Sequence, residues 1–194
     1  MQTEMILASG SPRRAALLRE AGYRFRTIVP SIPEPDHAGG DVTPAEEAEA
    51  LSYFKAREVA GMVPNGLILG ADTVVSHNGR VFGKARDRAD AERILSALMG
   101  TTHEVITGVT VLDASDGRRA IEHDVTRVTM RRLTRSELDT YLDSEAWTGK
   151  AGAYGIQDQD DPFVERIDGS FSNVVGLPLD LVRDLLARWS GTQV

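Results

Sequence analysis

The chain has 194 residues, 22 of them basic and 29 acidic, so its formal net charge is −7 at neutral pH. This balance disfavours a nucleic-acid or anionic-membrane surface as partner, although locally concentrated cations could still bind a small polyanion. The absence of cysteine excludes disulfides and thiolate chemistry and fits a reducing cytoplasm. No basic leader and no apolar run of membrane-spanning length are visible, so we expect a cytoplasmic protein.

The first predicted elements are a short strand and a helix joined by a small-residue turn. The apolar run at 5–8 predicts the strand, and Ser11 is a natural N-cap for a helix over 12–21, which begins with proline. Arg13 and Arg14 fall in the first turn, where the helix dipole disfavours cations. A bound anion would resolve that conflict, but these residues alone equally allow two solvated surface arginines.

A second helix is predicted by the capping box Thr-Pro-Ala-Glu at 43–46, and it extends to about residue 60. We expect its apolar stripe, which includes Ala48, Leu51 and Phe54, to face the core.

The continuous apolar run at 67–71 predicts a buried strand. Asp72 then lies at the end of that strand, where open α/β sheets bind their ligands. A carboxylate there is costly unless it binds a cation, accepts hydrogen bonds or performs chemistry. Capping of a turn is the structural alternative, but the residues that follow are typical of a strand, which favours a functional role.

The rest of the chain interleaves strands and helices irregularly, and Asn78-Gly79 predicts a hairpin turn. We expect strands at 105–112, 121–130 and 163–167, and helices at 88–99, 134–142 and 179–189. This arrangement predicts an α/β domain with a mixed sheet.

Polar side chains at three further positions are candidates for ligand contacts. Lys55 and Lys84 could contact phosphate, although each lysine alone is more typical of a solvated charge. Glycines recur at every third position from 149 to 155, which suits a backbone that approaches a ligand closely. Gln157 ends this stretch, and its amide matches the imide edge of uracil or thymine. A loop glutamine bonded to its neighbours is equally compatible.

Seven short motifs occur in order over nearly the full length, and the run Lys-Ala-Gly-Ala-Tyr-Gly-Ile-Gln is the most specific. They lie at 9–14, 55–56, 71–75, 83–84, 103–109, 150–157 and 173–178. This ordered set resembles the Maf-like nucleotide pyrophosphatase family, and its Ala-Tyr-Gly-Ile-Gln form resembles the branch that acts on dTTP and UTP.

The resemblance implies a single domain over residues 1–194, with two lobes, a central cleft and an elongated mixed sheet flanked by helices. It implies hydrolysis of nucleoside triphosphates, above all dTTP and UTP, to the monophosphate and pyrophosphate. A divalent cation, Mg²⁺ or Mn²⁺, is the implied cofactor. The implied partners are the nucleotide substrate and a second copy of the chain in a homodimer.

The resemblance also implies roles for individual residues. Asp72 is expected to activate the water, directly or through the metal, and Glu34 to assist at the metal. Arg13, Thr73 and Gln157 match positions associated with substrate choice. The full substrate-binding set is Ser9, Ser11, Arg13, Arg14, Lys55, Thr73, Lys84 and Gln157.

One departure from the family pattern leaves base selectivity open, because an acidic run at 158–161 stands where small, glycine-rich residues are usual. Two alternatives therefore remain. One is a pyrophosphatase for 7-methyl-GTP or purine nucleotides, and the other is a non-catalytic, nucleotide-binding regulator of cell division. A purely structural domain does not explain the ordered motifs.

Overall fold

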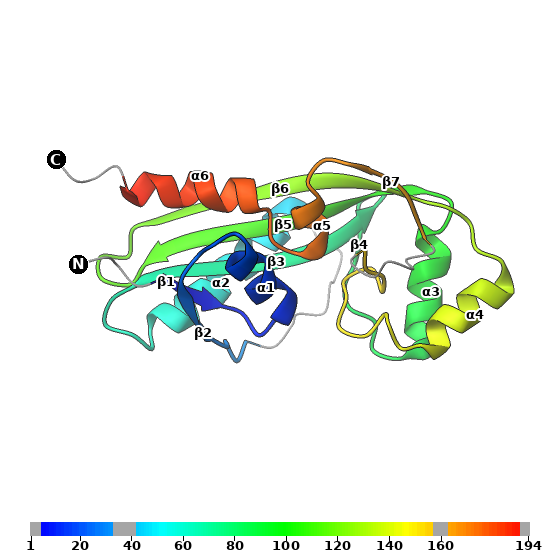
Figure 1. The fold of residues 1–194 in the computed structure, drawn as a ribbon, viewed down its shortest axis with the longest axis horizontal. Helices are drawn as coiled ribbons and strands as arrows, with labels where there is room; N and C mark the ends of the chain where they lie inside the picture. Colours follow the sequence, from blue (N-terminus) through cyan, green and yellow to red (C-terminus); the bar gives the residue numbers. More distant parts are fainter. Residues whose placement is uncertain (1–4, 33–41, 157–162, 191–194) are drawn as a thin grey trace.

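The computed structural model describes residues 5–32, 42–156 and 163–190 (Figure 1). The strands are β1 (Met5–Ala8), β2 (Phe25–Ile28), β3 (Leu67–His77), β4 (Arg80–Phe82), β5 (Thr102–Asp113), β6 (Arg119–Met130) and β7 (Val164–Asp168). The helices are α1 (Pro12–Glu20), α2 (Pro44–Ala60), α3 (Arg88–Leu98), α4 (Arg135–Asp143), α5 (Phe171–Val175) and α6 (Leu179–Ser190). The expected α/β class with a mixed sheet is confirmed.

The sheet has seven strands in the order β2-β1-β3-β5-β6-β7, and β4 also pairs with β3. Because β5 occupies one edge of β3 from 67 to 76, both β1 and β4 pair along its other edge. β1 is parallel to β3 and reaches Gly70, whereas β4 is antiparallel and its last residue, Phe82, lies opposite Val75. Among the described residues, β3 therefore has no strand partner on this edge over 71–74, and the candidate site lies at this gap.

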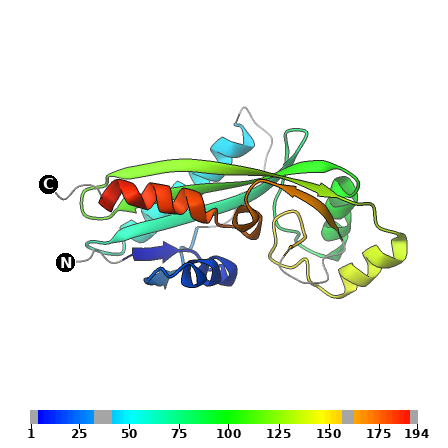
Figure 2. The same cartoon turned by 45° about the horizontal axis from the view of Figure 1, so that its top comes forward.

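Helices cover both faces of the sheet, with α1 and α6 on one face and α2 on the other (Figures 1 and 2). The two glycines under α2 explain how closely it approaches. A Cβ on Gly70 would collide with the carbonyl oxygen of Ser52, and one on Gly108 would collide with that of Ala48. The backbone of α2 thus packs directly against β3 and β5.

This close approach corrects the expected orientation of α2. The fully buried side chains of α2 are Ala48, which was expected, together with Ser52, Ala56 and Val59. Leu51 is only half-buried, and Phe54 is 46% exposed. Ala48 is thus confirmed as inward-facing, whereas the expectation was wrong for Leu51 and Phe54, because the helix backbone lies directly on the two glycines of the sheet.

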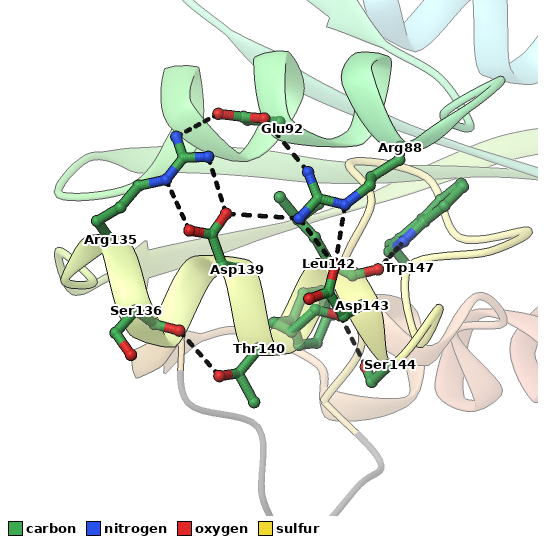
Figure 3. A network of polar contacts seen from close by, with 11 residues as sticks. Arg88, Glu92, Arg135, Ser136, Asp139, Thr140, Leu142, Asp143, Ser144 and Trp147 are labelled. Atoms are coloured by element: carbon green, nitrogen blue, oxygen red, sulfur yellow. Dashed lines mark hydrogen bonds and ion pairs between the residues drawn. The ribbon is translucent and has the colours of Figure 1, made fainter.

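A second lobe lies at the far end of the sheet, where α3 and α4 share a hydrophobic cluster with the end of β6. Ion pairs link the exposed sides of these two helices (Figure 3). Nη2 of Arg88 lies 2.8 Å from Oδ1 of Asp143, and Arg135 binds both Asp139 and Glu92. The expected two-lobed shape thus corresponds to hydrophobic clusters at the two ends of one sheet.

The local start signals for helices were accurate. Both capping boxes form both of their hydrogen bonds, at Thr43 with Glu46 and at Thr134 with Glu137. The helix α5 was not expected, and it is short, with five residues. Among the described helices, none is long and apolar enough to cross a membrane.

Candidate active site

The candidate site is a cavity of about 710 Å³ at the open edge of β3. One wall is the turn from β1 into α1, and the facing wall is the segment 148–156. The cavity therefore lies between the two lobes, as the expected central cleft requires. It brings together Ser9, Ser11, Arg13, Arg14, Lys55, Asp72, Thr73 and Lys84, which are eight of the residues expected at the site.

Glu34 and Gln157, the other two expected site residues, lie outside the described residues. Their expected roles at the metal and at the base therefore stay predictions.

The turn between β1 and α1 is organised by its own serines. Oγ of Ser11 accepts a hydrogen bond from the backbone N–H of Arg14, which confirms Ser11 as the N-cap. Oγ of Ser9 accepts one from the backbone N–H of Ser11 at 3.1 Å and one from Nη1 of Arg14 at 3.3 Å. These bonds fix the N-terminus of α1 at the cavity.

The two arginines of this turn have different partners. Nε of Arg14 donates to the carbonyl oxygen of Gly176 at 2.8 Å, and Nη2 donates to Oγ1 of Thr73 at 3.0 Å. Nη2 of Arg13 instead donates across the cleft to the carbonyl oxygen of Gly149 at 3.0 Å. Arg14 thus ties α1 to β3 and to the end of α5, whereas Arg13 bridges the two walls.

Burial also distinguishes Arg14 electrostatically. Desolvation is the main cause that lowers the pKa of its guanidinium, while Asp72 acts to raise it and Arg13 to lower it. The group stays charged at neutral pH, so the cavity wall holds a fixed, partly desolvated cation.

The position of Asp72 within its strand differs from the expected one. It lies in the interior of β3, which continues to His77, and not at the end of a strand. The strand that ends here is β1, whose last paired residue lies opposite Gly70. Asp72 faces the cavity because β1, the neighbouring strand on that edge of β3, ends before reaching it.

The ammonium of Lys55 forms an ion pair with Oδ1 of Asp72, and the two side chains are only 14% and 13% exposed. Lys55 reaches the carboxylate because α2 packs closely over Gly70. A cationic partner offsets part of the cost of burying a carboxylate in such a protected place.

Thr73 points to the opposite face of β3 from Asp72, because side chains alternate along a strand. Its Oγ1 lies 2.9 Å from Oγ1 of Thr107, which in turn donates to the carbonyl oxygen of Asn173 at 3.4 Å. The buried amide of Asn173 donates to the carbonyl oxygens of Val105 and Asp124 and to Oγ1 of Thr126.

Sequence reasoning gave no role to Thr107, Asn173 or Gly176, although the motifs at 103–109 and 173–178 contain them. Gly176 has φ of +123°, a conformation that favours glycine, and its carbonyl oxygen receives the bond from Arg14. These residues form the support behind Arg14 and Thr73.

The facing wall is attached by main-chain contacts to the two residues that follow β4. Lys84 and Ala151 form an isolated bridge, and the N–H of Gly152 donates to the carbonyl oxygen of Gly83 at 3.0 Å. Burial lowers the pKa of Lys84, and the nearby Arg14 and Arg13 lower it further. Three cations thus influence one another at this part of the cavity.

Lys150 is a further lining residue that had no expected role. A Cβ on Gly155 would lie 2.5 Å from Nζ of Lys150, so glycine at 155 leaves room for this side chain. Its position inside the motif 150–157 was the sequence feature that could have identified Lys150 as a candidate site residue.

Among the residues that the structure describes, the charged side chains that line the cavity are five cations and one carboxylate. They are Arg13, Arg14, Lys55, Lys84, Lys150 and Asp72. Such an excess of positive charge suits a ligand with several negative charges. It also explains how a chain of net charge −7 can bind a polyanion.

Over the described ranges, no group of three or more His, Asp or Glu residues could by itself hold a metal ion. Mg²⁺ usually binds through one or two carboxylates together with substrate phosphates. Asp72 fits that pattern, since its carboxylate could hold such an ion together with a phosphate ligand.

The sequence profile of the family described as "Maf-like protein" matches residues 4–189. The chain is 43% identical over 186 residues to the "dTTP/UTP pyrophosphatase" of Pelotomaculum thermopropionicum, with 96% of each chain covered. It is 42% identical over 196 residues to the "dTTP/UTP pyrophosphatase" of Bdellovibrio bacteriovorus, with 97% of this chain and 100% of the relative covered. A crystal structure of the "Nucleoside-triphosphatase / dITP/XTP pyrophosphatase" from Mycobacterium abscessus aligns with 98% of this chain and 100% of its own, at 15% identity and a TM-score of 0.46.

Proposed function

Because this chain belongs to the Maf-like protein family, we propose that it hydrolyses dTTP and UTP to the nucleoside monophosphate and pyrophosphate. The observation that carries the proposal is the cavity itself, because the charged residues among its described lining are five cations and one carboxylate, that of Asp72. Five positive charges suit the polyphosphate of such a substrate, and the carboxylate suits activation of water.

Binding of the triphosphate is assigned to the cationic walls. Arg13, Lys84 and Lys150 line the cleft from both sides and can neutralise phosphate oxygens. The N-terminus of α1 adds backbone N–H groups and a favourable dipole for the same charge. Ser9 holds Arg14 in place and can donate its hydroxyl proton to phosphate.

Asp72 is the residue that activates the water. It accepts the proton as the water attacks, and the bond between the α- and β-phosphates then breaks, with pyrophosphate as the leaving group. Lys55 orients the carboxylate through Oδ1, which leaves Oδ2 for the proton. Rigid positioning of this pair by α2 and β3 reduces the reorganisation needed during the reaction.

The proposed cofactor is Mg²⁺ or Mn²⁺, held by Asp72 and phosphate oxygens with Glu34 as a further ligand. When bound, such an ion neutralises charge on the phosphates and lowers the pKa of a coordinated water. Arg13, Thr73 and Gln157 are assigned to substrate choice, with the amide of Gln157 pairing with the imide edge of the pyrimidine.

The remaining expectations are part of the same proposal. Residues 1–194 act as one domain, and the chain forms a homodimer in the cytoplasm and binds neither nucleic acid nor membrane. Light scattering of the purified protein at two concentrations tests the dimer directly, since a monomer mass at both would contradict it.

The identity of the products tests the proposed reaction. Phosphorus NMR of a reaction with UTP and Mg²⁺ is expected to show UMP and pyrophosphate in equal amounts. UDP with inorganic phosphate would show cleavage at the wrong bond. Binding of UTP without any product would instead favour the alternative of a non-catalytic, nucleotide-binding regulator.

A further inference from the structure

His103, on β5, is a buried side chain in contact with a residue of the cavity wall. Only 1% of it is exposed, and its Nε2 lies 2.7 Å from Oη of Tyr154. The two rings meet edge to face, with centroids 5.4 Å apart. The hydrogen bond joins residues that are 51 positions apart in the chain.

The imidazole is neutral at physiological pH. Burial lowers the pKa of His103 to about 4, and the nearby His77 contributes to the decrease. Its Nδ1 is also buried and has no hydrogen-bond partner among the described residues. Such an unsatisfied atom is unfavourable for stability, so stability alone does not account for a histidine at this position.

Tyr154 belongs to an apolar part of the cavity wall. Val75, Val105, Ile156 and Val174 line the cavity and pack in the same hydrophobic cluster as Tyr154. A wall of this composition suits the nucleoside end of a nucleotide, whereas the cations suit its phosphates.

The backbone next to Tyr154 needs to be held in place. Gly152 has φ of +70° and Ala153 has φ of +60°, and a positive φ is unfavourable for alanine. The side chain of Tyr154 follows directly, so its contact with His103 anchors this strained turn to β5.

We infer that His103 is a positioning residue, which fixes the buried ring of Tyr154 and with it the apolar part of the cavity wall against which the nucleoside part of the substrate packs. The inference rests on the proposed function and adds to it a determinant of nucleoside selectivity. His103 acts through Tyr154 and does not itself take part in the reaction.

His103→Phe and Tyr154→Phe each remove the hydrogen bond and keep a ring. Loss of one neutral hydrogen bond is expected to raise KM for dTTP and UTP about fivefold to tenfold, with kcat within about twofold. The ratio of kcat/KM for UTP over CTP should fall by a similar factor. The double variant should be no worse than either single variant, because both remove the same bond.

His103→Gln is the conservative control, since its amide can reach the position of Nε2, and it should recover most of the selectivity. A purely structural role would lower Tm and reduce the activity towards all nucleotides equally. An unchanged UTP/CTP ratio in His103→Phe, or a Gln variant no better than the Phe variant, would overturn the inference.

A different result would contradict the proposed function, namely that the wild-type protein releases no pyrophosphate from any nucleotide. The same variants are then compared by calorimetric binding of UTP and CTP. A ratio of affinities that falls in His103→Phe still supports positioning, and an unchanged ratio contradicts it.

Discussion

The ammonium of Lys55, on α2, forms an ion pair with Oδ1 of Asp72, on β3, at the gap where β1 no longer pairs with β3. A helix on one face of the sheet thus holds the carboxylate that faces the cavity. This arrangement makes Lys55 dependent on Asp72 for its effect on the reaction.

Asp72→Asn keeps the shape of the side chain but removes the proton acceptor. We expect kcat to fall by about a hundredfold or more, the usual consequence of losing a well-placed catalytic group. Lys55→Met keeps the apolar stem and should also lower kcat. In steady-state kinetics, the double variant should be no slower than Asp72→Asn alone, and additive losses would show that Lys55 acts independently.

Arg13 and Arg14 should differ when each is replaced by alanine. Arg14→Ala removes charged hydrogen bonds to Gly176 and Thr73, so we expect a loss of about 2 kcal/mol in the free energy of unfolding. Arg13→Ala should raise KM for UTP and change stability little. Urea denaturation and initial rates on both proteins check this difference, which equal stability losses would refute.

Gly70→Ala tests the close packing of α2 on the sheet. The added Cβ meets the backbone of Ser52, and overpacking of this kind typically costs about 1–3 kcal/mol. Because α2 carries Lys55, kcat should fall as well. Gly61→Ala, at the C-cap of α2 with φ of −68°, is the matched control. If both variants have the Tm of the wild type in thermal unfolding, α2 does not pack as closely on Gly70 as we describe.

Stability should decrease with acid in a way that depends on His103. Its folded pKa of about 4 lies below the ordinary 6.5, so the unfolded chain binds more protons between these two values. The free energy of unfolding therefore falls as the pH drops through this window, by up to about 3 kcal/mol from this group, and the group has no effect above it.

His103→Gln lacks this contribution. Urea denaturation of both proteins between pH 7 and pH 4 should show a steeper loss for the wild type than for the variant. Parallel curves would mean that His103 is not held in its neutral form.

Signals local in sequence predicted much of the fold. The capping boxes at Thr43 and Thr134 and the Asn78-Gly79 turn act over a few residues, and the structure has each of them. The interior position of Asp72 was not predicted, because a charged residue after an apolar run is typical of the end of a strand. Where β3 lacks a neighbour depends instead on the pairing of β1 and β4, which are distant in the sequence from each other.

Eight of the ten residues expected at the site line one cavity, but the sequence did not indicate which residues they contact. Arg14 and Gly176 are 162 positions apart, and no local pattern indicates that they meet. The same is true of His103 and Tyr154. Leu51 and Phe54 were wrongly expected to face the sheet, because the close approach of α2 depends on Gly70 of β3 and Gly108 of β5, which the pattern of the helix does not show.

The most direct test of the proposed function is pyrophosphate release from dTTP, UTP, CTP, GTP, ITP and 7-methyl-GTP, with and without Mg²⁺ or Mn²⁺. Wild-type protein and Asp72→Asn are compared, and nucleotide binding to the variant is measured in parallel. We expect metal-dependent release that is fastest with dTTP and UTP, and a variant that binds UTP but does not hydrolyse it. Faster release from 7-methyl-GTP or a purine nucleotide, or equal turnover by Asp72→Asn, would contradict the proposed function.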